Sequence, residues 1–118
     1  MTGEAHAAEL AEMFRLMGDP SRLRILLACL EEPVAVGDLA ARLELSPSLV
    51  SHHLRLLRAT RLVRSERRGK QVFYVAADEH VRRVLTDMVA HVSEITSDPT
   101  ATPKPAATPK PAATIESD

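Results

Sequence analysis

Several residue types on which other protein classes depend are scarce in this chain. Its 118 residues contain no Trp, one Tyr and two Phe, so the core has to be built from Leu, Val, Ala, Ile and Met. The single cysteine, Cys29, excludes an internal disulfide and fits a reducing compartment. There is no run of about 18 apolar residues, which excludes a transmembrane helix. The length suits one domain with a modest core.

The motifs of secretion and catalysis are also missing. The acidic N-terminus, residues 1–12, lacks the basic and apolar regions of a signal peptide, so we expect a cytoplasmic protein. The sequence has no glycine-rich phosphate loop and no evident nucleophile–base pair. We therefore expect neither an enzyme nor a protein with a small-molecule substrate. Cys29 is expected to be a buried core thiol on the helix face of Leu26 and Leu30.

The charged residues are segregated along the chain, although the formal net charge is only −1. Residues 1–46 hold four Lys or Arg and eight Asp or Glu, residues 47–76 hold seven and one, and residues 77–118 hold four and seven. The middle segment is therefore +6, between flanks of −4 and −3. A concentrated basic patch on a balanced protein favours a polyanionic partner such as DNA, whereas a solvated charged face would not need such clustering.

Cap signals divide the first half of the chain into four expected helices. Residues 4–17 carry apolar side chains at helical spacing, and Gly18 stops that helix. Asp19-Pro20 then provides an N-cap and a first-turn proline for a second, strongly apolar helix. A brief third helix is expected within residues 36–45.

The fourth helix starts with the same signal, Ser46-Pro47, and ends near Thr60. Its apolar positions predict four core-facing side chains: Leu49, Val50, Leu54 and Leu57. Its polar positions are then left more exposed: Ser48, Ser51, His52, Arg55 and Arg58. For His53 both a DNA-facing and a packed position stay open.

A β-hairpin and a last helix are expected after residue 61. Residues 62–67 and 71–76 are rich in β-formers, and a tight Arg68-Gly69-Lys70 turn joins them, with Gly supplying a positive φ. This pattern predicts a two-stranded hairpin with a basic tip. The last helix is expected over about 79–96, and its apolar stripe consists of Val81, Val84, Leu85, Met88, Val92 and Ile95.

The composition changes at Asp98. The sequence TPKPAA occurs twice in succession, at 102–107 and 108–113. Proline at this density, without an apolar period, predicts a disordered tail over residues 98–118. One folded domain is then expected over residues 1–97.

The last helix contains four residues of metal-ligand type in the pattern D-x-H-x(10)-H-x-x-E: Asp78, His80, His91 and Glu94. At about 100° per residue, the two histidines and Glu94 share one face of a helix. The eleven residues from His80 to His91 span roughly 16 Å, which is too far for one ion because zinc–nitrogen bonds are about 2.0–2.1 Å. A second, antiparallel copy of the helix resolves this, since Asp78 and His80 of one chain can meet His91 and Glu94 of the other. Asp78 itself is expected at or before the N-cap.

Two imidazoles and two carboxylates without a thiolate suit Zn²⁺ or Co²⁺. Ca²⁺ and Mg²⁺ prefer all-oxygen shells. Ni²⁺ ranks behind because it needs more ligands, one of which His6 could supply. Four protein ligands leave no open position for a substrate, which favours a regulatory metal over a catalytic one. Asp87, on the same helix, is expected to be a solvated acid or an outer partner of the site.

These elements together make a mainly α (α+β) winged helix-turn-helix of about five helices and a two-stranded wing. The sequence resembles the ArsR/SmtB family of bacterial metal-responsive repressors over roughly residues 8–96. The resemblance rests on GDPSRLRILLAC, on VGDLAARLELSPSLVSHHLRLLRATRLV, on RRGKQVFYV and on the four-ligand pattern. It implies a homodimer held by its first and last helices, with a zinc-type site across the two chains. A second, cysteine-built site of some members is not expected, because Ala35 stands at the cysteine position.

The resemblance also implies a direction of regulation, in which the metal-free protein represses and the metal-bound protein releases its operator. We expect the helix from Ser48 to read DNA, because helix-turn-helix proteins place this part in the major groove. Base or phosphate contacts are assigned to Ser48, Ser51, His52 and Arg55, and backbone or minor-groove contacts to Arg67, Arg68, Lys70 and Gln71. A dimer implies a palindromic operator with half-sites about one helical turn apart.

Two other functions stay open from the sequence. One is a winged-helix regulator that answers to a non-metal effector. The other is a metal buffer or structural zinc dimer that does not regulate DNA, against which the +6 middle segment argues.

Overall fold

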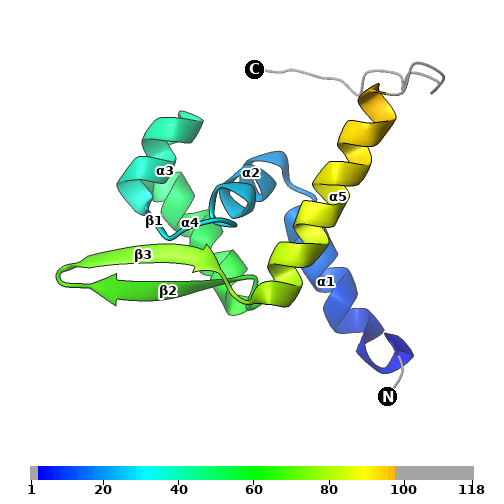
Figure 1. The fold of residues 1–118 in the computed structure, drawn as a ribbon. Helices are drawn as coiled ribbons and strands as arrows, with labels where there is room; N and C mark the ends of the chain where they lie inside the picture. Colours follow the sequence, from blue (N-terminus) through cyan, green and yellow to red (C-terminus); the bar gives the residue numbers. More distant parts are fainter. Residues whose placement is uncertain (1–2, 98–118) are drawn as a thin grey trace. The chain divides into compact units, whose positions relative to one another are not determined.

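The computed structural model describes residues 3–97 (Figure 1). In chain order the elements are a short 3-10 helix η1 (Gly3–His6), α1 (Ala7–Met17), α2 (Pro20–Ala28), β1 (Val34–Ala35), α3 (Val36–Leu43), α4 (Pro47–Ala59), β2 (Val63–Arg68), β3 (Gln71–Ala76) and α5 (Glu79–Ser97). The chain divides into two units, one that ends at Leu85 and one that starts at Thr86. The tail expected over 98–118 lies outside the described residues.

The helix N-caps lie where the sequence predicted them. Asp19 Oδ2 accepts a hydrogen bond from the Arg22 amide at 2.9 Å, and Ser46 Oγ accepts one from the Leu49 amide at 3.1 Å. Each cap satisfies one of the amides that a helix N-terminus leaves without an intrahelical partner. A proline follows each cap in the first turn. These two signals therefore fix the starts of α2 and α4.

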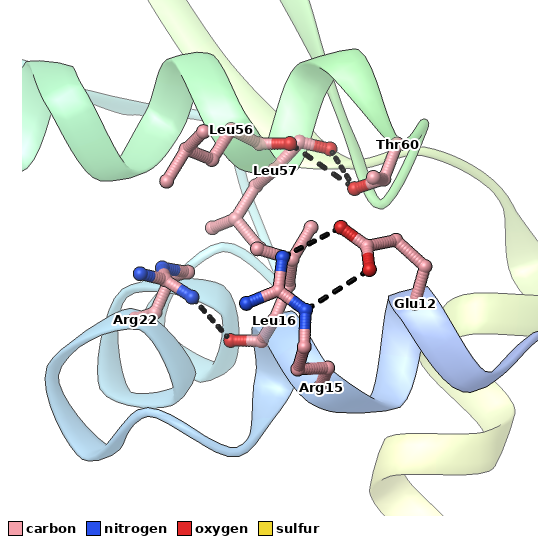
Figure 2. A network of polar contacts seen from close by, with 7 residues as sticks. All are labelled: Glu12, Arg15, Leu16, Arg22, Leu56, Leu57 and Thr60. Atoms are coloured by element: carbon pink, nitrogen blue, oxygen red, sulfur yellow. Dashed lines mark hydrogen bonds and ion pairs between the residues drawn. The ribbon is translucent and has the colours of Figure 1, made fainter.

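The C-terminus of α4 is capped by hydrogen bonds before the hairpin begins. The Thr60 hydroxyl donates to the carbonyls of Leu56 and Leu57 at 3.1 and 3.2 Å (Figure 2). Arg61 then adopts a left-handed conformation with φ of 63°, and the Leu62 amide donates to Leu57 O at 2.9 Å. This is the helix-ending geometry that usually employs glycine. It turns the chain directly from α4 into β2.

The sheet has three antiparallel strands in the order β1-β3-β2, rather than the two expected. In the β2–β3 hairpin Arg68 pairs with Gln71, so the turn is the two residues Gly69 and Lys70, with Gly69 at φ 64° as predicted. The additional strand β1 pairs Val34 with Tyr74. Two residues are too few to show an alternating pattern, which is why the sequence did not indicate this strand.

A single apolar cluster holds the first unit together. Its most deeply buried side chains come from α2, β1, α3, α4 and β2: Ile25, Leu26, Cys29, Val34, Leu39, Val50, Leu54, Leu57 and Val63. Cys29 is completely buried, as expected. None of the described helices is long and apolar enough to cross a membrane. The observed elements confirm the mainly helical winged helix-turn-helix.

The prediction that Leu49 faces the core was wrong. Leu49 is 39% exposed, whereas Val50, His53, Leu54 and Leu57 are buried. These four positions follow the i, i+3, i+4, i+7 spacing of one helical stripe, and Leu49 lies about 100° away from Val50. His53 therefore occupies a core-facing position of α4 that Leu49 was expected to share.

Replacing Ser46 by Ala should destabilise the protein by about 1 kcal/mol, because the Leu49 amide loses its cap. Urea unfolding followed by circular dichroism measures this difference. Ser51→Ala is the matched control on the same helix, and we expect it to change stability by less than about 0.5 kcal/mol. Equal losses for the two variants would show that the Ser46 cap contributes nothing specific.

The thiol of Cys29 should be inert in the native protein. Burial raises its pKa to about 12, against a smaller lowering effect of the Arg42 charge, so almost no thiolate exists at pH 8. We expect an aromatic disulfide reagent to label native protein roughly a thousandfold more slowly than protein unfolded in guanidinium. Fast labelling of the folded protein would contradict the buried position.

Candidate nucleic-acid interface and metal centre

The outward side of α4 carries the residues expected to read DNA. Ser48, His52 and Arg55 are exposed, and Ser51 is half-buried. They lie on the surface because the opposite side of the same helix is buried in the core. Short hydroxyls, an imidazole and a guanidinium are the groups that bond base edges and phosphates. The face therefore has the chemistry of a helix-turn-helix reading surface.

The wing carries a row of charges on one side of β2. Glu66 accepts from Arg64 at 2.7 Å and from Arg68 at 3.0 Å. These residues alternate along the strand and so share a face. The hydrogen bond from Arg64 is the main cause that lowers the pKa of Glu66, with Arg68 adding to it. Arg68 also lies over the Phe73 ring, 5.4 Å from its centroid, so the hairpin itself orients this guanidinium.

The other wing-tip residues, Arg67, Lys70 and Gln71, are exposed. Among residues 3–97, five basic side chains of the middle segment make no hydrogen bond or ion pair within the protein: Arg55, Arg58, Arg61, Arg67 and Lys70. Exposed cations without an internal partner are available to neutralise phosphates. The basic patch inferred from composition is thus concentrated on α4, the turn after it and the wing.

His53 is packed rather than DNA-facing, which settles the position that the sequence left open. Only 7% of its surface is exposed. Its Nδ1 accepts a hydrogen bond from Arg22 Nε at 3.2 Å, and Arg22 Nη1 donates to Leu16 O at 3.1 Å (Figure 2). Burial lowers the pKa of His53, and the charges of Arg22 and His52 lower it further, against a raising effect of Asp19.

Sequence reasoning missed the role of Arg22. The two partners lie 31 residues apart, on α2 and α4, so no local pattern joins them. The only signal was indirect: His53 falls on the buried stripe of α4, and a buried imidazole needs a hydrogen-bond partner. The stacking of Arg68 on Phe73 was missed for a similar reason, because it depends on the register of the hairpin.

Asp78 lies at the N-cap of α5, as predicted. Its Oδ1 accepts a hydrogen bond from the Val81 amide at 3.0 Å, so the N-cap uses only one of the two carboxylate oxygens. The first turns of α5 are also tied to the loop that follows α2, since Arg82 Nε donates to Leu30 O at 2.7 Å. This bond holds the start of the helix, and with it Asp78 and His80, on the body of the first unit.

All four expected metal ligands, Asp78, His80, His91 and Glu94, are exposed. Across residues 3–97 no three His, Cys, Asp or Glu side chains are gathered closely enough to hold a metal ion. The donor set itself, two imidazoles and two carboxylates, fits a borderline divalent ion. Their meeting across two chains stays a prediction.

The remaining candidate ligands have other surroundings. His6 lies in η1, and its Nδ1 is 3.1 Å from Oε1 of Glu9, three residues further along the chain. Asp87 is an exposed residue of α5. Ala35 lies in β1 and offers no side-chain donor. The described structure thus adds no ligand to the four that the sequence indicated.

Comparison with known proteins agrees with this architecture. The family model for bacterial regulatory proteins of the arsR family matches residues 19–65, from the N-cap of α2 into β2. The transcriptional repressor SmtB homolog of Synechocystis sp. is 43% identical over 88 residues, which cover 75% of this chain and 67% of that protein. The HTH-type transcriptional regulator CmtR of Mycobacterium tuberculosis is 41% identical over 98 residues, which cover 83% of each protein.

A solved structure shows the same fold. It is the homodimeric winged helix-turn-helix DNA-binding domain of a possible ArsR-family transcriptional regulator from Mycobacterium bovis. The similarity has a TM-score of 0.72 at 24% identity and covers 77% of this chain and 84% of that one. The two relatives are regulators of transcription. Together with the observed fold, these matches show that the chain belongs to the arsR family of bacterial regulatory proteins.

Proposed function

We propose that this protein is a metal-sensing transcriptional repressor. Its metal-free homodimer binds a palindromic operator, and Zn²⁺ or Co²⁺ held across the dimer lowers the affinity for DNA and so derepresses metal efflux or resistance genes. The observation that carries the proposal is the pairing of an outward, polar and basic reading face on α4 with a separate set of metal-type donors on α5. The reading face would bind DNA, and the donors would bind the metal ion that the protein senses.

Unpartnered apolar side chains support a homodimer. Of the eight large hydrophobic side chains exposed among residues 3–97, seven lie on α1 and α5: Leu10, Phe14, Val84, Met88, Val89, Val92 and Ile95. Within the first unit, α1 and the first turns of α5 also line an apolar hollow. A soluble monomer rarely leaves so many large apolar side chains uncovered. We infer that a second copy of the chain covers it, in agreement with the homodimeric relative of the same fold.

The proposed ligand set is Asp78 and His80 of one chain with His91 and Glu94 of its partner. A bound ion would cross-link the two chains through its coordination bonds. Without the ion, only side-chain packing would hold the chains together. Asp78 can hold the N-cap of α5 with one oxygen and offer the other as a ligand.

Metal binding and DNA binding are expected to be reciprocally linked. A dimer restrained by the cross-link would present its two α4 helices at a spacing that fits adjacent major grooves less well. If bound metal lowers the affinity for DNA by a given factor, bound DNA lowers the affinity for metal by the same factor. This linkage can be tested by measuring operator affinity with and without metal.

Operator affinity should fall about 5- to 150-fold when Zn²⁺ or Co²⁺ is added, which corresponds to a coupling of about 1–3 kcal/mol. Fluorescence anisotropy on the DNA upstream of the protein's own gene, with and without Zn²⁺, Co²⁺ and Ni²⁺, measures this change. His91→Asn should bind DNA equally with and without metal, while Asp87→Asn on the same helix should respond as the unaltered protein does. If dialysis finds no tight metal and His80→Ala behaves as wild type, a non-metal effector is favoured instead.

A mixed dimer tests whether the ligands come from two chains. His80→Ala and His91→Ala homodimers should each lack both metal sites. A heterodimer of the two variants should regain one site, because the chain with intact His80 meets the chain with intact His91. Isolated by two different affinity tags and titrated with Co²⁺, it should show half the absorbance of wild type. A heterodimer as empty as the two homodimers would contradict the intersubunit arrangement.

A further inference from the structure

Two partly buried hydrogen bonds of one arginine link the reading helix to two other helices. Arg22, on α2, donates through Nε to His53 Nδ1 of α4 at 3.2 Å. The same guanidinium donates through Nη1 to Leu16 O, in the last turn of α1, at 3.1 Å. The backbone amide of Arg22 is held by the Asp19 carboxylate at 2.9 Å. The side-chain hydrogen bond between α2 and α4 therefore depends on a single imidazole.

The chemistry of the pair defines the protonation state of His53. A guanidinium can only donate hydrogen bonds, so Nδ1 must be the acceptor and cannot carry a proton. The neutral ring then carries its proton on Nε2. Protonating Nδ1 would place an N–H and a positive charge against the Arg22 N–H. The hydrogen bond and the charged imidazole are thus mutually exclusive.

The surroundings of His53 favour the neutral ring. The charged groups that face it are Arg22 from α2, Asp19 from the turn before α2, and His52 from α4 itself, whose ring centroid lies 5.7 Å away. Burial, then Arg22 and His52, lower the pKa of His53, and only Asp19 raises it. Because the folded pKa lies below the ordinary value of about 6.5, the stability that His53 contributes is complete above that value. It is lost as the pH falls through the folded pKa.

We propose that the Arg22–His53 hydrogen bond is a brace that sets the position of α4, and that protonation of His53 releases this brace and so weakens operator binding in acid. The inference rests on the proposed DNA-binding function. His53 acts as a positioning residue, since its buried side chain does not face the DNA. Mild acid then becomes a second signal, independent of the metal ligands on α5.

Two substitutions of His53 separate the brace from the titration. His53→Asn keeps an uncharged acceptor at the place of Nδ1 but cannot be protonated near neutral pH. His53→Phe keeps a planar ring but has no acceptor. Operator affinity of metal-free protein, in a chelator, is measured for both variants and wild type from pH 7.5 to 5.5. The other histidines are the same in all three proteins, so the difference between wild type and the variants reports on His53 and on its electrostatic coupling to His52.

We expect the wild type to lose more affinity than His53→Asn over this range, by up to about tenfold, because only the wild-type side chain gains a proton and its pKa lies below about 6.5. At pH 7.5 His53→Asn should bind within about threefold of wild type, and His53→Phe about tenfold or more weakly because Arg22 loses its acceptor. An acid loss that is the same in wild type and His53→Asn would overturn the proposal.

Spectroscopy keeps the brace testable without DNA. Nitrogen-correlated NMR of the imidazole rings at pH 7.5 should show His53 with its proton on Nε2, and urea unfolding should show that His53→Asn loses less stability than wild type on acidification. A ring protonated on Nδ1 would refute the brace. If wild type does not bind the operator at pH 7.5, the proposed function fails, whereas these two readouts still decide the brace on their own.

Discussion

The burial of one stripe of α4 is the constraint on which the surface chemistry depends. Val50, Leu54 and Leu57 anchor the helix in the core shared with α2, α3 and β2. With that stripe buried, the short polar and basic residues on the other side of α4 can only face solvent. The chain leaves α4 through the left-handed turn at Arg61 directly into the hairpin, so the same core also carries the basic wing, which projects from the helical body (Figure 1).

The buried stripe of α4 contains one polar residue, His53. Its presence makes the position of the helix depend on protonation as well as on packing. His53 has a core-facing position, but its hydrogen bond to Arg22 depends on the ring remaining neutral. An apolar residue there would stabilise the helix without this dependence. A metal on α5 and a proton on α4 would thus act on the same reading surface through separate side chains, one set exposed and one buried.

Much of this organisation follows from local sequence signals. The caps at Asp19, Ser46 and Asp78, and the glycine of the hairpin turn, depend on neighbouring residues only, and the structure confirms them. The strand β1, the exposure of Leu49 and the partnership of Arg22 with His53 depend on which elements meet in three dimensions, and no local pattern contains that information. The proposed metal ligands combine both cases: their types and spacing can be read from one segment of the sequence, but the site that we propose for them depends on a second chain.

The central claim is that two chains share each regulatory ion. Native mass spectrometry of the protein with Zn²⁺, at concentrations spanning the monomer–dimer equilibrium, tests it most directly. We predict that zinc is retained only by the dimer, at two ions per dimer, and that the monomer is metal-free. A monomer that carries one zinc ion, and loses it when His80 or His91 is replaced, would contradict the account.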